Sequence, residues 1–125
     1  MPEVVRYAIR FDPWYRALST ILGLPPSGAY VDMADDAVDV RMGWAFRARV
    51  PRSAVASVSR SPLRPLSRGV HGFAGRWLVN GSGKGILSLA FAPTQRASVL
   101  GVSVSLRELL VSVEDPDGLT RLLAR

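Results

Sequence analysis

The chain has 125 residues, of which 48% are hydrophobic and 21% are charged; this balance predicts one compact domain spanning residues 1–125 and excludes a disordered chain. It contains no cysteine, which excludes a disulfide framework, a zinc knuckle and a thiol nucleophile. The net charge of +6 comes from 16 Lys and Arg, of which only Lys84 is lysine; the excess either attracts anions or reflects a GC-rich gene.

The first elements are a strand and a helix. Residues 4–11 alternate between apolar and polar, which predicts a half-buried strand with Val5, Tyr7, Ile9 and Phe11 on one side. Asp12 and Pro13 are typical of an N-cap and a first helical position, so we expect a helix near residues 13–22. Its apolar face comprises Trp14, Leu18, Ile21 and Leu22. We expect this face to pack over the sheet or in a contact between copies rather than on a membrane, because Arg16 is the only cation opposite it.

A strand and a hairpin are expected next. Residues 29–34 form a short strand, and the even-numbered positions from 38 to 50 are apolar. A three-residue connection at 43–45 keeps Met42 and Phe46 on one face of the hairpin. The same register places Asp39 opposite Arg49, an attractive cross-strand pair.

The second half of the chain is less regular. Residues 54–60 give a weaker strand signal, and 61–75 are expected to form a long loop because proline, glycine and arginine are scattered through it. Strands over 76–80 and 85–92 bracket a glycine-rich turn. Residues 93–107 are ambiguous, and the last strand covers about 108–114.

A terminal helix with clear capping signals is expected next. Asp115 is a good N-cap, and Pro116 suits the first helical position. Leu119, Leu122 and Leu123 follow at helical spacing and form one apolar stripe. We expect this helix to close the open end of a small barrel, and the tally of about seven strands and two helices indicates a mainly β (α+β) domain.

The order of these elements resembles bacterial pleckstrin-homology-like (PH-like) domains. The resemblance rests on the segment Val-Pro-Arg-Ser-Ala-Val-Ala-Ser-Val at 50–58 and on the step Val-Glu-Asp-Pro-Asp-Gly-Leu at 113–119. The segment Gly-Phe-Ala-Gly-Arg-Trp-Leu-Val-Asn-Gly at 72–81 is similar to an uncharacterised branch of such proteins. The resemblance implies a bent seven-stranded antiparallel barrel capped by the C-terminal helix, to which the helix at 13–22 is an addition. It implies no catalytic residues, and members of this superfold bind phosphoinositides, peptides or other proteins.

Arginine is the strongest candidate for a binding function. The region 60–76 is basic and contains no acidic residue. Arginine presents a planar fork of donors that suits phosphate or carboxylate. We therefore consider an anion-binding, Arg-rich rim, with solubility alone as the alternative; its members are Arg47, Arg52, Arg60, Arg64, Arg68, Arg76 and Lys84.

Other constellations are weaker. The loop at 80–85 departs from a phosphate-binding loop, because residue 78 is Leu, residue 85 is Gly and a strand follows. We expect a plain hairpin turn there instead, with Lys84 as a solvated charge. His71 has no second histidine or cysteine for zinc, and no local signature supports a catalytic triad of His71 with Ser67 or Ser82. The aspartates at 32, 35, 36 and 39 lack calcium-loop spacing and fit a solvated turn.

The sequence thus predicts a non-enzymatic binding or scaffolding domain without cofactor or metal. We expect its partner to be another protein, held at an exposed strand edge or at the 61–75 loop, with a homo-oligomer as one form of this. The alternative is an electrostatic binder of anionic lipid or nucleic acid through the Arg-rich rim. The start of the chain lacks the pattern of a signal peptide, and no run reaches the length of a membrane span, so we expect a cytoplasmic protein.

Overall fold

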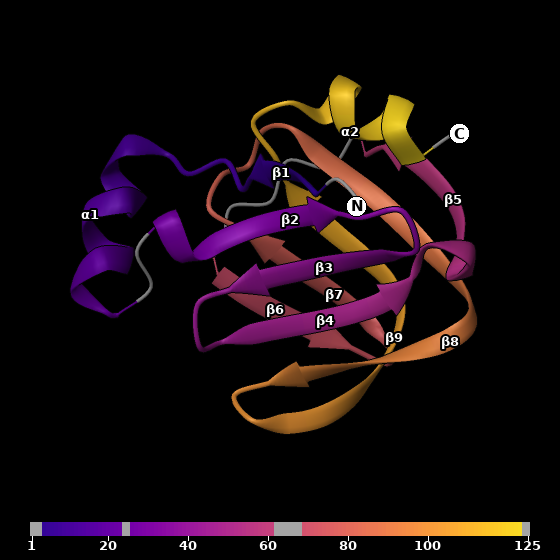
Figure 1. Ribbon diagram of the computed structural model, residues 1–125. Coiled ribbons are helices and arrows are strands. Elements are labelled where there is room, and N and C mark those ends of the chain that lie inside the picture. The colour runs from indigo at the N-terminus through magenta and orange to yellow at the C-terminus, as the bar shows by residue number, and fades with distance from the viewer. Residues whose placement is uncertain (1–3, 24–25, 62–68, 124–125) are drawn as a thin grey trace.

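A computed structural model of the chain describes residues 4–23, 26–61 and 69–123 and consists mainly of strands, as expected (Figure 1). In chain order the elements are β1 (Val5–Ala8), α1 (Pro13–Ile21), the short 3-10 turn η1 (Pro26–Gly28), β2 (Ala29–Met33), β3 (Ala37–Met42), β4 (Phe46–Pro51), the 3-10 turn η2 (Arg52–Ala54), β5 (Val55–Arg60), β6 (Gly69–Phe73), β7 (Arg76–Asn80), β8 (Ile86–Val99), β9 (Val102–Ser112) and α2 (Pro116–Leu123).

The strands form one curled sheet in the order β1-β2-β3-β4-β8-β9-β7-β6, and β5 pairs with β8. The long strands β8 and β9 are bent and take part in both halves of the curled sheet. Their hairpin end, at Val99 and Val102, continues the sheet from β4. The other half of β8 pairs with β5, and the matching half of β9 pairs with β7. The register shifts between Ala90 and Gln95, and this irregularity lets both strands take part in two halves of the curled sheet.

The mainly β class and both helices are confirmed, but two details of the expected barrel are wrong. The sheet has nine strands rather than seven, and β7 runs parallel to β9. One additional strand, β6, lies inside the predicted loop 61–75 and pairs with β7. The ambiguous region 93–107 is also extended: it holds the end of β8 and the start of β9, which meet in a turn at Leu100 and Gly101.

The glycine-rich turn at 81–85 does not join a hairpin, because β9 lies between β7 and β8. A Cβ atom at Gly81 would stand 2.5 Å from the Phe11 ring, and one at Gly85 would stand 2.6 Å from the Val113 carbonyl oxygen. Gly85 also has a positive φ of 68°. These glycines therefore allow the connection to pass close to the Phe11 ring and to the Val113 backbone. Close approach of this kind requires glycine just as a tight hairpin turn does.

The β3–β4 hairpin has the predicted register. Met42 pairs with Phe46 across the turn, and Asp39 pairs with Arg49. The Arg49 and Asp39 side chains form an ion pair of 3.9 Å. Alternate residues of β4 are buried and exposed, as period-two patterning requires for a sheet with one covered face.

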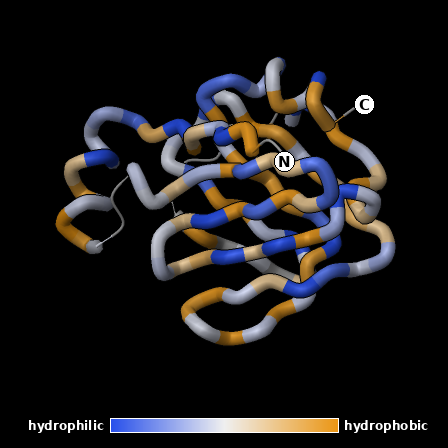
Figure 2. Tube along the Cα trace, viewed as in Figure 1, coloured by the Kyte–Doolittle hydropathy of each residue, from blue (hydrophilic) through white to orange (hydrophobic). Residues whose placement is uncertain are grey.

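The core lies inside the curl of the sheet. Its largest fully buried side chains come from β2, β3, β4, β7, β8, β9 and α2. They are Val31, Met33, Val38, Val40, Met42, Phe46, Val79, Leu87, Leu89, Leu106, Leu109 and Leu119. Hydrophobic and hydrophilic positions alternate along these strands in Figure 2. Burial of this apolar surface is the main stabilising contribution to the fold.

The terminal helix α2 covers one end of the curled sheet, at the top of Figure 1. The backbone N–H of Gly118 donates to the Asp115 carboxylate at 3.0 Å, which confirms the predicted N-cap. Leu119 is fully buried, whereas Leu122 and Leu123 are partly buried and pack against the core. The helix therefore closes the sheet mainly through one leucine.

The cap at Asp12 differs from the expectation. Asp12 precedes α1 with an extended backbone, and Pro13 is the first helical residue, but the Asp12 side chain makes no capping hydrogen bond. It accepts instead a hydrogen bond of 2.8 Å from the Ser82 hydroxyl. A carboxylate has enough acceptor sites for several donors, and here it ties the start of α1 to the loop between β7 and β8.

Candidate binding surfaces

The predicted Arg-rich rim does not gather at one place among the described residues. Arg52 donates from η2 to the Leu122 carbonyl oxygen, at the end of α2 where a cation is favoured. Arg60 forms an ion pair of 3.1 Å with Asp117 of α2, and Arg76 forms one of 2.7 Å with Glu108 of β9. Each of these three side chains therefore already has a partner within the chain.

The remaining members of the rim lie apart or outside the described residues. Arg47 projects from the outer face of β4, whereas Lys84 is exposed on the loop between β7 and β8. Arg64 and Arg68 lie outside the described residues. A shared anion-binding role for the seven residues therefore stays a prediction.

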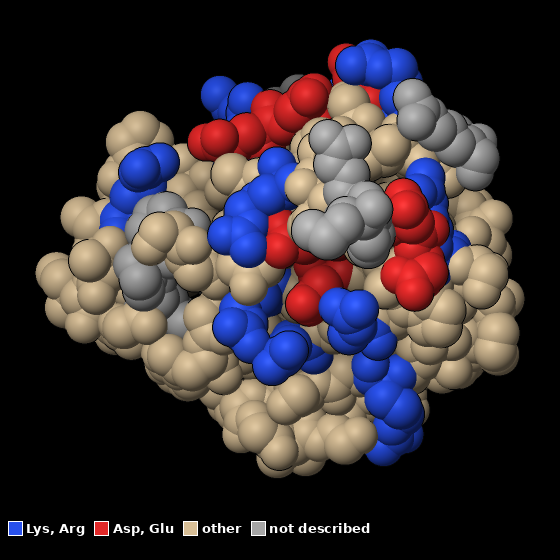
Figure 3. Space-filling model, viewed as in Figure 1, with Lys and Arg blue, Asp and Glu red and all other residues tan. Residues whose placement is uncertain are grey.

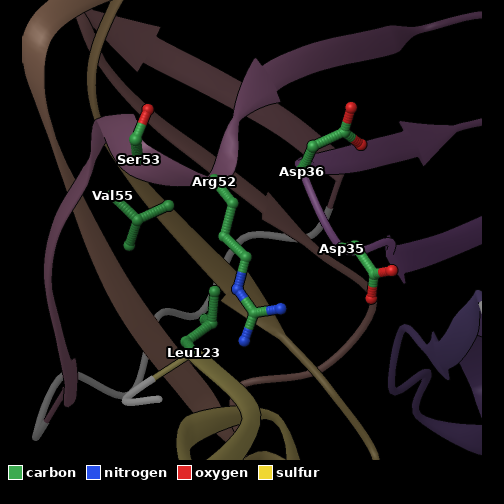
Figure 4. Close-up of a pocket in the computed structure, with 6 residues that line it drawn as sticks. All are labelled: Asp35, Asp36, Arg52, Ser53, Val55 and Leu123. Atoms are coloured by element: carbon green, nitrogen blue, oxygen red, sulfur yellow. The ribbon is translucent and has the colours of Figure 1, made fainter. Parts of the chain in front are cut away.

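A hollow of about 630 Å³ lies beside η2 (Figure 4). Asp35, Asp36, Arg52, Ser53, Val55 and Leu123 line it. Figure 4 shows the Arg52 side chain extending toward α2 next to Leu123, while both carboxylates point away from its guanidinium group. Because Arg52 binds a helix carbonyl here, the hollow's main donor already has a structural partner.

A second hollow, of about 300 Å³, lies at the glycine-rich loop. Arg10, Phe11, Asp12, Pro13, Ser82, Lys84 and Glu114 line it. The Ser82 hydroxyl is fully buried; it donates to Asp12 and accepts from the Lys84 backbone N–H at 3.1 Å. These bonds fix the loop in a compact shape that differs from an open phosphate cradle.

No metal site is found in the part of the chain that the structure describes: no group of three or more His, Cys, Asp or Glu side chains lies close enough to hold an ion. Asp32 and Asp39 instead bind Arg6 and Arg49. The side chain of His71 lies outside the described residues.

The apolar face of α1 does not pack over the sheet. Tyr15 and Ser19 are the buried residues of the helix, and the Tyr15 ring stacks on Phe11 at 5.7 Å between ring centroids. The predicted face is exposed: Ile21 is 81% exposed, and the exposed fractions of Trp14, Leu18 and Leu22 lie between 45% and 59%. Of the two expected locations for this face, a cover over the sheet is therefore wrong.

Two turns continue this exposed face. The Trp44 indole of the β3–β4 turn lies next to Gly23, where a Cβ atom would be 3.2 Å from the indole nitrogen. The backbone N–H of Leu100, in the β8–β9 turn, donates to the Ala45 carbonyl oxygen at 3.0 Å. Trp44, Leu100 and Val102 are each at least 60% exposed. We call the seven exposed side chains of α1 and the two turns the apolar patch: Trp14, Leu18, Ile21, Leu22, Trp44, Leu100 and Val102.

The apolar patch occupies one side of the molecule. In Figure 1 α1 and both turns lie on the left, and in Figure 3 that side is mostly uncharged. The pattern of α1 identified part of the patch from the sequence. The signal for the rest was the occurrence of Trp44 and Leu100 beside turn glycines, where polar residues are usual.

The outer face of β2, β3 and β4 is basic, with acidic side chains between the cations (Figure 3). Arg6 donates twice to the Asp32 carboxylate, at 2.7 and 2.8 Å, and these hydrogen bonds raise the pKa of Arg6 above its ordinary value. Its guanidinium carbon also lies 3.8 Å from the centre of the Tyr30 ring, a cation–π contact. Arg41 and Arg47 face each other on the next two strands.

No helix among residues 4–23, 26–61 and 69–123 combines the length and the apolar character needed to cross a membrane. Comparison with known proteins gives no match: no family model matches the chain, and neither a curated protein nor a solved structure matches it. The resemblance to PH-like domains therefore stays a prediction that rests on the sequence segments quoted for it.

Proposed function

We propose that the chain is a non-enzymatic binding domain whose partner is a protein, and that this partner is a second copy of the chain held on the apolar patch. The observation that carries the proposal is the exposure of the patch. Three segments form it: the end of α1 contacts the β3–β4 turn, and that turn contacts the β8–β9 turn. In each of the two described hollows, part of the polar lining already has a structural partner: Arg52 binds the Leu122 carbonyl oxygen, and Ser82 binds the Asp12 carboxylate.

The size of the apolar patch supports a stable contact. The two indoles, each about 60% exposed, contribute roughly 300 Å² of apolar surface, and the five aliphatic side chains add about as much. A total of about 600 Å² reaches the upper limit for the largest patch on a typical monomer. About 65% of a homodimer interface is apolar, so an apolar area of about 600 Å² corresponds to an interface of about 900 Å² per partner. This is close to the ~800 Å² that each partner contributes in stable complexes.

The chemistry of the patch supports a second copy as the partner. The segments that form it, 14–22, 44 and 99–102, contain one charged residue, Arg16, and no acidic residue. An acidic partner would find a single cation there, and a basic partner would find no acidic group. Two identical patches related by a two-fold axis meet without a like-charge cost at their centre.

Sedimentation equilibrium of the purified chain tests this proposal. We expect a monomer–dimer equilibrium that changes little between low and high salt, because apolar contacts are not screened. The double substitution Leu18→Gln and Ile21→Gln is expected to weaken dimerisation at least about 100-fold, since each substitution acts twice in a symmetric interface. Both side chains are exposed in the monomer, so folding should be preserved.

Val4→Gln is the matched control, because Val4 is 57% exposed but lies outside the apolar patch. It should leave the dimerisation constant unchanged. A chain that remains monomeric at all concentrations would contradict the proposal. A monomer that sediments with neutral phosphatidylcholine vesicles, and does so only with the patch intact, would assign the patch to lipid instead.

A further inference from the structure

Four side chains of neighbouring strands form a row across the outer face of the sheet. Tyr30 of β2 pairs with Arg41 of β3, Arg41 pairs with Arg47 of β4, and Arg47 pairs with Ser98 of β8. Their chain neighbours in β3 and β4, such as Val40 and Phe46, are fully buried. Because side chains alternate between the faces of a strand, all four residues of this arginine row project to the outside.

The arginine row differs in charge from its neighbour row. There, Asp32 and Asp39 neutralise Arg6 and Arg49 through ion pairs. Arg41 and Arg47 form no ion pair with any carboxylate of the described residues. Directly opposed residues have Cβ atoms about 5 Å apart, so two like charges there destabilise the sheet. A bound anion would remove this cost.

We propose that the arginine row is a binding site for a phosphoryl group. Two guanidinium groups offer planar forks of donors, which suit the oxygens of phosphate. Tyr30 and Ser98 flank the two arginines in the row, and each carries a hydroxyl group that can donate to a part of the ligand that extends beyond the arginine pair. Two positive charges match a phosphomonoester, which carries a charge of about −1.5 to −2 at pH 7. The site is separate from the apolar patch and does not depend on dimerisation.

Thermal unfolding with inorganic phosphate tests the site. For a dissociation constant of about 1 mM, 10 mM phosphate is expected to raise the Tm by about 5 °C over chloride of equal ionic strength. Arg41→Gln and Arg47→Gln should each abolish most of this rise. Each should also leave the Tm in chloride equal to that of the parent or higher, because the like-charge contact is gone.

Arg49→Gln is the matched control, since Arg49 lies on the same face of β4 but is paired with Asp39. This variant should keep the full phosphate-dependent rise. The site is disproved if the parent chain shows no rise, or if Arg41→Gln and Arg47→Gln rise as much as the parent.

Vesicle sedimentation distinguishes the two sources of a phosphoryl group. Vesicles of phosphatidylcholine with phosphatidic acid present it as a lipid headgroup. Sedimentation that requires both Arg41 and Arg47 would support the site and identify its ligand as a headgroup. A phosphate-dependent Tm rise without vesicle binding would support it with a soluble phosphorylated ligand. Vesicle binding that survives both substitutions would disprove the row as the headgroup site.

Discussion

At the scale of single residues, burial separates leucines that look alike in the sequence. Leu119 and Leu18 both belong to apolar stripes of short helices, yet Leu119 is fully buried and Leu18 is 45% exposed. Periodicity identifies the face of a helix on which such residues lie, but it does not show what covers that face. The contribution of each leucine to stability therefore follows from the structure.

Leu119→Ala is expected to lower the free energy of unfolding by about 2–5 kcal/mol, because it removes buried methyl groups and leaves a cavity under α2. Leu18→Ala is the matched control and should change it by less than about 0.5 kcal/mol. Urea unfolding of both variants measures the difference. Equal losses in the two variants would mean that α2 does not close the sheet.

The capping residues show how far local rules extend. Asp115 caps α2 as its sequence context predicts, through a bond to Gly118 three residues away. Asp12 stands in the same context before a proline, but its carboxylate binds Ser82 of a distant loop. A cap depends on neighbours along the chain, so it is predictable; a bond between residues 12 and 82 depends on tertiary structure, which overrides the local preference.

At the scale of elements, the sequence predicts the positions of strands and helices better than it predicts which strands pair. The β3–β4 hairpin has its predicted register because a short turn and the period-two pattern determine it together. The expected pairing of β7 was wrong, since its parallel partner β9 begins at Val102, 22 residues after β7 ends at Asn80. A parallel pair requires a long crossover connection, and no local pattern specifies which strand it reaches.

The β6–β7 pair offers a test of this part of the sheet. A Cβ atom at Gly72 would lie 2.1 Å from the Trp77 ring, whose N–H holds the Ser105 carbonyl oxygen of β9. Gly72→Ala is therefore expected to displace the indole and to lower the free energy of unfolding by about 1–3 kcal/mol. Near-ultraviolet circular dichroism should report the changed tryptophan environment.

Gly28→Ala is the control for that variant, because a Cβ atom there would be 3.8 Å from the nearest backbone atom, an ordinary contact. Its effect on stability should stay below about 1 kcal/mol. A Gly72→Ala variant as stable as the Gly28→Ala variant would contradict the placement of Trp77 against β6.

At the scale of the whole molecule, apolar and basic surfaces are segregated. Residues 40–107 contain no acidic residue, so the acidic side chains come from the segments on either side. The paired charges on the outer sheet involve Asp32 and Asp39, and the acid-free stretch supplies Arg47, Trp44 and Leu100. The apolar patch and the arginine row thus lie close along the chain but respond to different conditions: salt weakens phosphate binding and leaves an apolar contact largely unchanged.

The central claim is that two copies meet through the apolar patch, and a distance measurement between copies tests it most directly. Because the chain has no cysteine, Ala17→Cys provides a single site for a spin label, on an exposed position of α1 that is not a member of the apolar patch. Double electron–electron resonance should show a short distance between the labels of the two copies, and this coupling should disappear on tenfold dilution with unlabelled protein. A long distance between the labels, at concentrations where the labelled chain sediments as a dimer, would show that the copies meet elsewhere.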